Sequence, residues 1–379
     1  MGFLFGCERQ EPAPSFVKDS AGVHIVQHGS SAAPTSNMRL AQEPDYRVGW
    51  KVGDPTFELI NSGVLLADGR AVVGDYGSRT LIVLSPSGEI EGVFGGPGQG
   101  PGEIGTLKTI NRIGGDTIAV EDGLNARISI FHEGSILRTV LTNTSGSIIP
   151  RMIAVEGDER GLIMRSSTYN PNFSEPWLQG VVARFDLALD RLDTLRSFDW
   201  APNRATSTQV FRVQGVVSST GGDILIGRTD RPQIDRFNPD GQLTQILRFP
   251  RARKVITEGI WASYKWFFMT EPQSNLGTQG RASLFAQIRW PIGDPLPYFG
   301  KLFGDEKGNA WVADFSVIPR TVERFDVFSP AGEWLGSLSL PPLFRVLDIR
   351  GGMILGVEID ELWVNAVALY RIEGWEQVS

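Results

Sequence analysis

Six short β-rich stretches, each built around a glycine turn, recur along this chain of 379 residues. Two examples are LLADGRAVVGD and RIGGDTIAVED. The spacings between successive turn glycines are 46, 46, 61, 86 and 44 residues, and the glycines are Gly69, Gly115, Gly161, Gly222, Gly308 and Gly352. A unit that recurs in this way buries its apolar face against its neighbours, so the chain is predicted to be a repeat architecture.

A period near 45 residues predicts one four-stranded sheet per repeat, because four strands of five or six residues and their turns use about 40 to 50 residues. Six repeats predict an all-β fold, a six-bladed β-propeller of four-stranded antiparallel blades. The two longer spacings indicate insertions. In the first repeat we assign strands a, b, c and d to residues 63–67, 70–74, 80–85 and 90–95.

The last repeat supplies only three strands before the C-terminus, in RVLDI, MILGV and AVALYRI. We expect residues 46–54, YRVGWKVGD, to add the missing outer strand, so that an N-terminal strand closes the ring and removes two open sheet edges. Residues 22–27 are expected at another outer edge. The propeller is therefore predicted to span residues 21–379, after a signal remnant or tether at residues 1–20.

The segment from Gly95 to Gly102 holds five glycines and two prolines in eight residues. A Walker loop would end in Gly-Lys-Ser/Thr, whereas Gly100 is followed by Pro101. A dinucleotide-binding turn would lead into a helix, but β-branched residues alternate after this segment. We interpret it as the crossover from the outer strand of one blade to the inner strand of the next, where glycine permits positive φ.

Two segments resemble NHL-repeat proteins and related six-bladed propellers of the bacterial envelope. VFGGPGQGPGEI is similar to their blade-to-blade crossover. The segment IAVEDGLNARISIFHEGS is similar to one of their repeats through Asp122, Asn125, Arg127, Ile128 and Phe131. The resemblance runs from about residue 20 to the end of the chain. It implies a propeller fold and little chemistry, because propellers host many unrelated functions.

A net charge of −7 argues against nucleic-acid binding as the main function. The one cysteine, Cys7, excludes an internal disulfide, and the stretch LFGC resembles the end of a bacterial lipoprotein signal. We expect a cell-envelope protein, periplasmic or extracellular, lipidated at Cys7, with an ordinary disordered terminus as the alternative. No run approaches the roughly 20 apolar residues that span a bilayer.

Residues 253–292 are predicted to form a helical insertion in the fourth blade or in the crossover that follows it. Thr257 is the expected N-cap, and aromatic residues follow at helical spacing, among them Trp261, Tyr264 and Phe268. We expect these aromatic side chains to pack onto the propeller. A lid or a partner-docking surface is the alternative.

Charged residues are predicted to gather on one rim of the channel, where b–c loops and d–a crossovers emerge together. The residues six positions after a turn glycine end strand b, and the charged ones are Asp75, Glu121, Arg228, Asp314 and Glu358, with Arg165 near that position in the third repeat. Seven positions before the glycine stand Lys108, Lys301 and Arg345. For each acid the alternative role is to accept backbone hydrogen bonds in a neighbouring turn, as we expect for Asp122.

This mixed-charge rim predicts a non-catalytic, monomeric binding protein whose ligand at the channel face is a protein, peptide or glycan. No cofactor is required and the membrane is reached only through the lipid anchor. The alternative is a lactonase-like hydrolase or lyase whose rim acids coordinate calcium, since carboxylate oxygens suit that ion. A zinc lyase that needs clustered histidines is disfavoured, because the chain has only His24, His28 and His132.

Overall fold

The computed structural model describes residues 15–50, 54–142, 148–152, 162–168, 177–185, 191–202, 210–270, 277–288, 292–318, 323–360 and 362–378. Within them the chain is mostly β-strand. Its helices are α1 (Glu258–Thr270), α2 (Thr278–Ala286) and a terminal 3-10 helix, η1 (Trp375–Val378). In this described part, no helix combines the length and the apolar character needed to cross a membrane.

The described strands form six hydrogen-bonded sheets, and from β5 onward the strands that follow one another within a sheet pair antiparallel. The first sheet contains β5 (Ile60–Leu65), β6 (Ala71–Asp75), β7 (Thr80–Leu84) and β8 (Ile90–Gly95). The second contains β9 (Leu107–Gly114), β10 (Thr117–Asp122), β11 (Arg127–His132) and β12 (Ser135–Leu141). These bounds confirm the four strands expected for the first repeat to within three residues.

The remaining sheets follow the same pattern. The third contains β13 (Ile148–Met152), β14 (Leu162–Thr168), β15 (Trp177–Phe185) and β16 (Arg191–Pro202). The fourth contains β17 (Gly215–Thr220), β18 (Asp223–Arg228), β19 (Gln233–Phe237) and β20 (Leu243–Arg248). The fifth contains β21 (Phe299–Gly304), β22 (Ala310–Asp314), β23 (Arg324–Phe328) and β24 (Trp334–Ser339). The sixth begins with β25 (Phe344–Arg350), β26 (Met353–Ile359) and β27 (Asn365–Glu373).

The first strands of five sheets gather around the centre. Residues of β5, β9, β17, β21 and β25 line one central cavity of about 180 Å³. Strand β5 lies beside both β9 and β25, and β17 lies beside β21. Antiparallel four-stranded sheets that radiate from a shared channel define a β-propeller.

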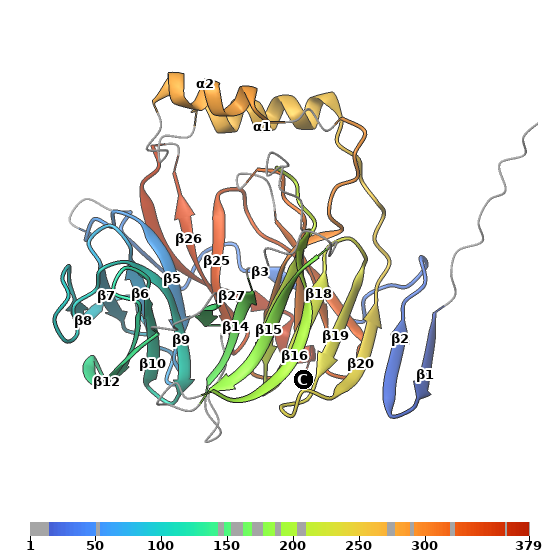
Figure 1. The fold of residues 1–379 in the computed structure, drawn as a ribbon, viewed down its shortest axis with the longest axis horizontal. Helices are drawn as coiled ribbons and strands as arrows, with labels where there is room; N and C mark the ends of the chain where they lie inside the picture. The colour runs from blue at the N-terminus through green and yellow to red at the C-terminus, as the bar shows by residue number, and fades with distance from the viewer. Residues whose placement is uncertain are drawn as a thin grey trace, which may run out of the picture.

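Four short N-terminal strands join the outer edges of two sheets. The hairpin of β1 (Phe16–Ser20) and β2 (Val23–Gln27) extends the fourth sheet, because β2 pairs in parallel with β20. This confirms the expected outer-edge position, and the hairpin stands beside β20 in Figure 1. The other two, β3 (Arg39–Leu40) and β4 (Tyr46–Val48), both pair with β27. Strand β4 is shorter than the predicted 46–54, because Gly49 follows it at φ +94°, and residues 51–53 lie outside the described part.

Buried side chains fill the spaces between neighbouring sheets. Ile60 and Val73 of the first sheet pack in one cluster with Val357 and Val367 of the last, and Tyr46 of β4 joins them. A second cluster joins the first and second sheets, a third the fourth and fifth, and a fourth the fifth and sixth. Each fully buried aliphatic or aromatic side chain contributes about 1.5–3 kcal/mol, so these contacts hold each sheet against its neighbour.

The glycine-rich segment after β8 is a crossover into β9, as predicted, and two side chains of the NHL-like motif hold it. Arg127 donates hydrogen bonds to the carbonyls of Gln99, Gly100 and Glu103 at 2.9, 3.0 and 2.6 Å. Asn125 donates to the Gly98 carbonyl at 2.9 Å. A loop without strand partners must satisfy its carbonyls in another way, and this motif does so from the next sheet.

The helical insertion lies between β20 and β21, so it belongs to the crossover between the fourth and fifth sheets. Thr257 caps α1 as predicted, because its hydroxyl accepts a hydrogen bond from the Ile260 amide at 3.3 Å. Figure 1 shows the two helices together above one face of the sheets. Trp261 is 1% exposed and packs with Ile256 and Leu296 in a cluster that includes Phe211 and Phe315 from outside the insertion, as expected for aromatic packing, and the insertion contains two helices.

Candidate functional site

Two aspartates at the ends of second strands bind the backbone that enters the first strand of their own sheet. Asp75 accepts hydrogen bonds from the amides of Glu58 and Leu59 at 3.0 and 2.9 Å. Asp122 accepts them from the amides of Gly105 and Thr106 at 3.0 and 2.8 Å. Both carboxylates are 2% exposed. Asp75 therefore has the alternative role expected for the rim acids, which is to accept backbone hydrogen bonds.

Counting from the turn glycines aligns Glu121 with Asp75, but Asp122 is the residue that occupies the position of Asp75 in the second sheet. Asp75 pairs with the first residue of β5, and Asp122 with the first residue of β9. The count differs by one because Gly115 opens a two-residue turn, whereas Gly69 stands at the end of a longer one. Glu121 is itself buried at 7% exposure, and the Thr109 hydroxyl lies 3.4 Å from its carboxylate.

Glu358 binds the N-terminal strand β4. Its carboxylate accepts two hydrogen bonds from Arg47, at 2.5 and 3.0 Å, and one from the hydroxyl of Tyr370. Burial raises the pKa of Tyr370 to about 12, and the hydrogen bond to Glu358 adds to the rise. Glu358 therefore fastens β4 to the last sheet.

Arg228 and Asp314 line two different cavities. The Arg228 guanidinium pairs with Asp230 at 2.6 Å and Asp199 at 2.5 Å, and it lies 4.4 Å from the Trp177 ring centre. Its cavity measures about 240 Å³. Asp314 pairs with Arg251 at 3.1 Å and lines a cavity of about 200 Å³.

The three predicted basic rim residues are also engaged. Lys301 pairs with Glu323 at 2.9 Å. The stem of Lys108 lies against Gly123, where it fills the space that a side chain would need. Arg345 donates to the carbonyl of Ile60, and burial lowers the pKa of its guanidinium.

Six of the predicted rim residues each bind a separate partner within the fold, and they are Asp75, Arg228, Asp314, Glu358, Lys301 and Arg345. Arg165 lies on β14, its side chain falls outside the described part, and Cys7 lies outside it altogether. The central cavity holds instead the pair of Arg112 and Asp348, which braces three inner strands through the backbone of Leu65. Burial raises the pKa of Asp348, and the charge of Arg112 opposes that rise.

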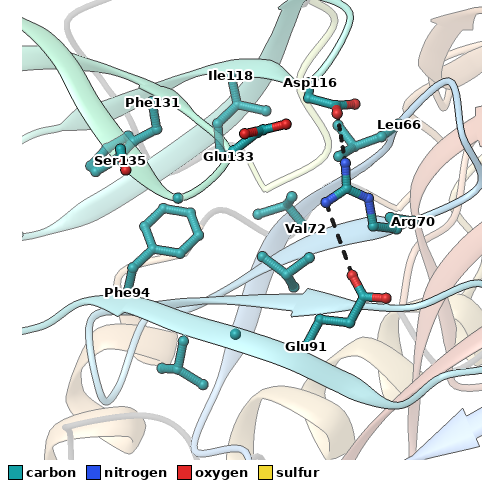
Figure 2. Close-up of a pocket in the computed structure, with 14 residues that line it drawn as sticks. Leu66, Arg70, Val72, Glu91, Phe94, Asp116, Ile118, Phe131, Glu133 and Ser135 are labelled. Carbon is teal, nitrogen blue, oxygen red and sulfur yellow. Dashed lines mark hydrogen bonds and ion pairs between the residues drawn. The ribbon is translucent and has the colours of Figure 1, made fainter.

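A cavity of about 520 Å³ lies between the first two sheets, at the ends of β6 and β10 opposite to Asp75 and Asp122. Figure 2 shows Arg70 between Glu91 and Asp116, with Phe94 and Phe131 on the other side of the hollow. Arg70 pairs with Asp68 and Asp116 at 2.6 Å each and lies 3.9 Å from Glu91. Its cation is already matched by carboxylates, so we interpret this group as a clamp between the two sheets.

The largest cavity described here, of about 820 Å³, is strongly basic. Four arginines from three segments line it, Arg231, Arg248, Arg251 and Arg324, and no Asp or Glu does. We call it the arginine groove. Its arginines come from the β18–β19 loop, from the end of β20 with the crossover after it, and from the start of β23, all at the face where b–c loops and d–a crossovers emerge.

The arginines of the groove fall into two kinds. Arg251 and Arg324 share the buried carboxylate of Asp326, at 2.5 and 3.1 Å. Arg248 donates only to the neutral amide oxygen of Gln233, at 3.0 Å, and Arg231 is exposed. The described part of the chain offers no carboxylate within 4 Å of either Arg231 or Arg248. The groove therefore keeps positive charge on an acidic protein.

Sequence reasoning missed the groove, because packing of the fourth and fifth sheets brings its arginines together from residues 231 to 324. One local signal was present in the run RFPRARK, which places four cations within residues 248–254 of a chain with net charge −7. As for metals, the described residues contain no group of three or more His, Cys, Asp or Glu side chains placed to hold an ion.

Comparison with known proteins supports the fold. No protein-family model matches the chain, and no curated protein matches it by sequence. It is similar to a solved structure from Bacteroides fragilis, named as an exported protein, with TM-score 0.50, 12% identity, and coverage of 92% of this chain and 98% of that one. It is also similar to a DUF4221 family member from Bacteroides vulgatus, with TM-score 0.54, 11% identity, and coverage of 89% and 99%. Likeness at this identity shows the fold alone.

Proposed function

We propose that this chain is a non-catalytic, six-bladed propeller of the bacterial cell envelope that binds a protein, peptide or glycan at the face of its b–c loops and d–a crossovers. Each of the six sheets is one blade, and strand β4 closes the ring. Three contacts support closure: β5 lies beside β25, β4 pairs with β27, and Arg47 of β4 binds Glu358.

The envelope location is supported by two observations. The stretch that ends at Cys7 has the character of a lipoprotein signal. A structure of the same fold is named as an exported protein. We infer that the chain acts outside the cytoplasm, attached by a lipid at Cys7.

The observation that carries the binding proposal is the arginine groove. Its volume falls within the range of about 300–1,000 Å³ typical of ligand sites. It opens on the expected face, and no carboxylate of the described residues forms an ion pair with Arg231 or Arg248, although the charge of the partly buried Asp235 acts on both. A binding site with unmatched charge is prepared for a ligand of the opposite charge.

The alternative, a calcium-dependent hydrolase or lyase, would require several rim acids to converge on one ion. Asp75, Asp314 and Glu358 each bind a different partner within the fold, and those partners lie in different sheets or at their edges. Their oxygens are occupied by hydrogen bonds that a metal would have to break. The geometry therefore favours binding over metal-assisted catalysis.

A metal test separates the two functions. The purified full chain, dialysed against a chelator, is melted with and without Ca²⁺ or Zn²⁺ and is assayed for lactone hydrolysis. If the protein binds its ligand without a metal, Tm should be the same without metal, with Ca²⁺ and with Zn²⁺, and no lactone should be hydrolysed. A site filled at about a hundredfold over its Kd would add about 2.7 kcal/mol, so a metal-dependent rise in Tm together with hydrolysis would contradict the proposal.

A further inference from the structure

We propose that the arginine groove binds an acidic segment of a polypeptide in an extended conformation. The inference rests on the proposed binding function and names its ligand class. It starts from the difference between the two kinds of arginine in the groove. Arg251 and Arg324 both pair with Asp326, whereas the guanidinium groups of Arg231 and Arg248 have no ion-pair partner among the described residues and offer N–H groups to a ligand.

The two available arginines are positioned in different ways before any ligand arrives. The backbone of the loop that carries Arg231 is fixed at both ends, because the Arg231 amide donates to the Arg228 carbonyl and its own carbonyl accepts from Gln233. Arg248 is oriented through its Nε by the Gln233 amide oxygen. Both guanidinium groups match carboxylates through paired hydrogen bonds, and the Arg248 side chain loses little freedom on binding because it is already oriented.

The walls of the groove require apolar groups in the ligand as well as negative charge. Pro232, Pro250 and Trp334 stand among the arginines. Trp334 is fixed by stacking on Phe328, at 6.2 Å between ring centres, and by its indole N–H, which donates to the carbonyl of Gly336. An extended polypeptide can carry both carboxylates and apolar side chains along its length, and this lining would contact both.

Two other anionic partners fit the groove less well. A flat membrane surface cannot enter a concave site of this volume. A sulfated or carboxylated glycan carries charge but lacks apolar side chains for Pro232, Pro250 and Trp334. The groove continues into the adjoining cavity of about 200 Å³, which shares Pro250 and Arg251, so a linear chain has room to extend. That cavity adds Lys254 together with Asp314 and Asp326, whose carboxylates pair with Arg251.

The test uses a fluorescein-labelled peptide in which Glu alternates with Pro, since proline keeps the chain extended. A matched peptide carries Gln in place of Glu. Anisotropy should report saturable binding of the Glu peptide to the full chain and at least about tenfold weaker binding of the Gln peptide. Binding should also weaken as ionic strength rises from about 0.01 to about 0.1 M, because the Debye length falls from about 30 to about 10 Å.

The variant Arg231→Gln with Arg248→Gln should weaken binding by at least about tenfold. The control, Arg39→Gln with Arg138→Gln, removes the same charge from exposed positions on β3 and β12 and should leave the affinity within about twofold. Equal weakening by the control and the groove variant would overturn the proposal, since net charge would then explain binding.

Two further probes identify the class of ligand. Dextran sulfate and vesicles of anionic phospholipid are measured against both variants under the same conditions. Groove-dependent binding of either probe, with none of the Glu peptide, would overturn the peptide assignment but leave the proposed binding function standing. The proposed binding function would be contradicted by a different result, which is metal-dependent catalysis.

Discussion

Asp122→Asn is the substitution that most sharply tests how the crossover after β8 is held. The Asp122 carboxylate accepts hydrogen bonds from two incoming backbone amides, from the Asn125 side chain at 2.6 Å and from Arg127 Nε at 3.3 Å. An amide group in its place puts an NH₂ group, itself a donor, where other donors converge, so hydrogen bonds are lost. It also leaves Arg127, whose side chain is 8% exposed, without its counter-charge.

The expected loss follows from these contacts. Removing one partner of a buried ion pair costs about 3–5 kcal/mol, so Asp122→Asn should lower the free energy of unfolding by about that amount at neutral pH. Asp75→Asn is the matched control, because Asp75 accepts only backbone hydrogen bonds. The loss of a side-chain cap of this kind costs about 0.5–2 kcal/mol.

The assay is urea unfolding followed by tryptophan fluorescence, combined with cleavage after Glu103 by a glutamate-specific protease. Arg127 holds the Glu103 carbonyl, so a loosened crossover should be cut faster in Asp122→Asn than in Asp75→Asn. Equal stability losses and equal cleavage rates in the two variants would refute the assigned role of Asp122.

The pH dependence gives a second measurement on the same residue. Burial acts to raise the pKa of Asp122, but hydrogen bonds from Gly105, Thr106 and Asn125 outweigh it and hold the pKa below its ordinary value of 3.8. The stabilisation is therefore fully present above 3.8 and is lost as the pH falls through the lower pKa of the folded state. The stability difference between wild type and Asp122→Asn should shrink in acid, and a constant difference would contradict the assignment.

Three other substitutions have defined outcomes. Glu358→Gln should lower the pKa of Tyr370 from about 12 in an ultraviolet titration read against Tyr370→Phe, and an unchanged pKa would disprove their contact. Lys301→Ala should cost more than the roughly 1 kcal/mol of an exposed pair, because it leaves Glu323, whose side chain is 8% exposed, without its cation, and a loss below about 1 kcal/mol by urea unfolding would contradict this role of the pair. Trp261→Ala should cost about 3–5 kcal/mol and remove helical circular dichroism first, whereas simultaneous loss of strand signal would show that the helices and sheets unfold together.

Local patterns in the sequence predicted most of the fold. The glycine turns predicted where the hairpins lie along the chain, because a hairpin depends on a few adjacent residues. Thr257 and the aromatic spacing after it placed the helical insertion for the same reason. The NHL-like motif marked Asp122 and Arg127, and the structure adds that they hold the preceding crossover.

The site was less predictable, because its contacts join distant parts of the chain. Counting from turn glycines gave Glu121 in place of Asp122, since turn length varies by one residue between repeats. The sequence could not show that Glu358 binds Arg47, a residue 311 positions away. The arginine groove likewise depends on how two sheets pack, so only the basic run at its centre was visible beforehand.

The measurement that most directly tests the closed ring is a disulfide between β4 and β27. Val48 and Val367 are cross-strand partners and share one buried cluster. Such partners have Cα atoms about 4.5–5.5 Å apart, within the range that a disulfide spans. In a Cys7→Ser background, Val48→Cys with Val367→Cys should oxidise within one chain, giving a faster non-reducing gel band and a folded protein. Free thiols, or disulfides only between chains, would contradict closure by the N-terminal strand.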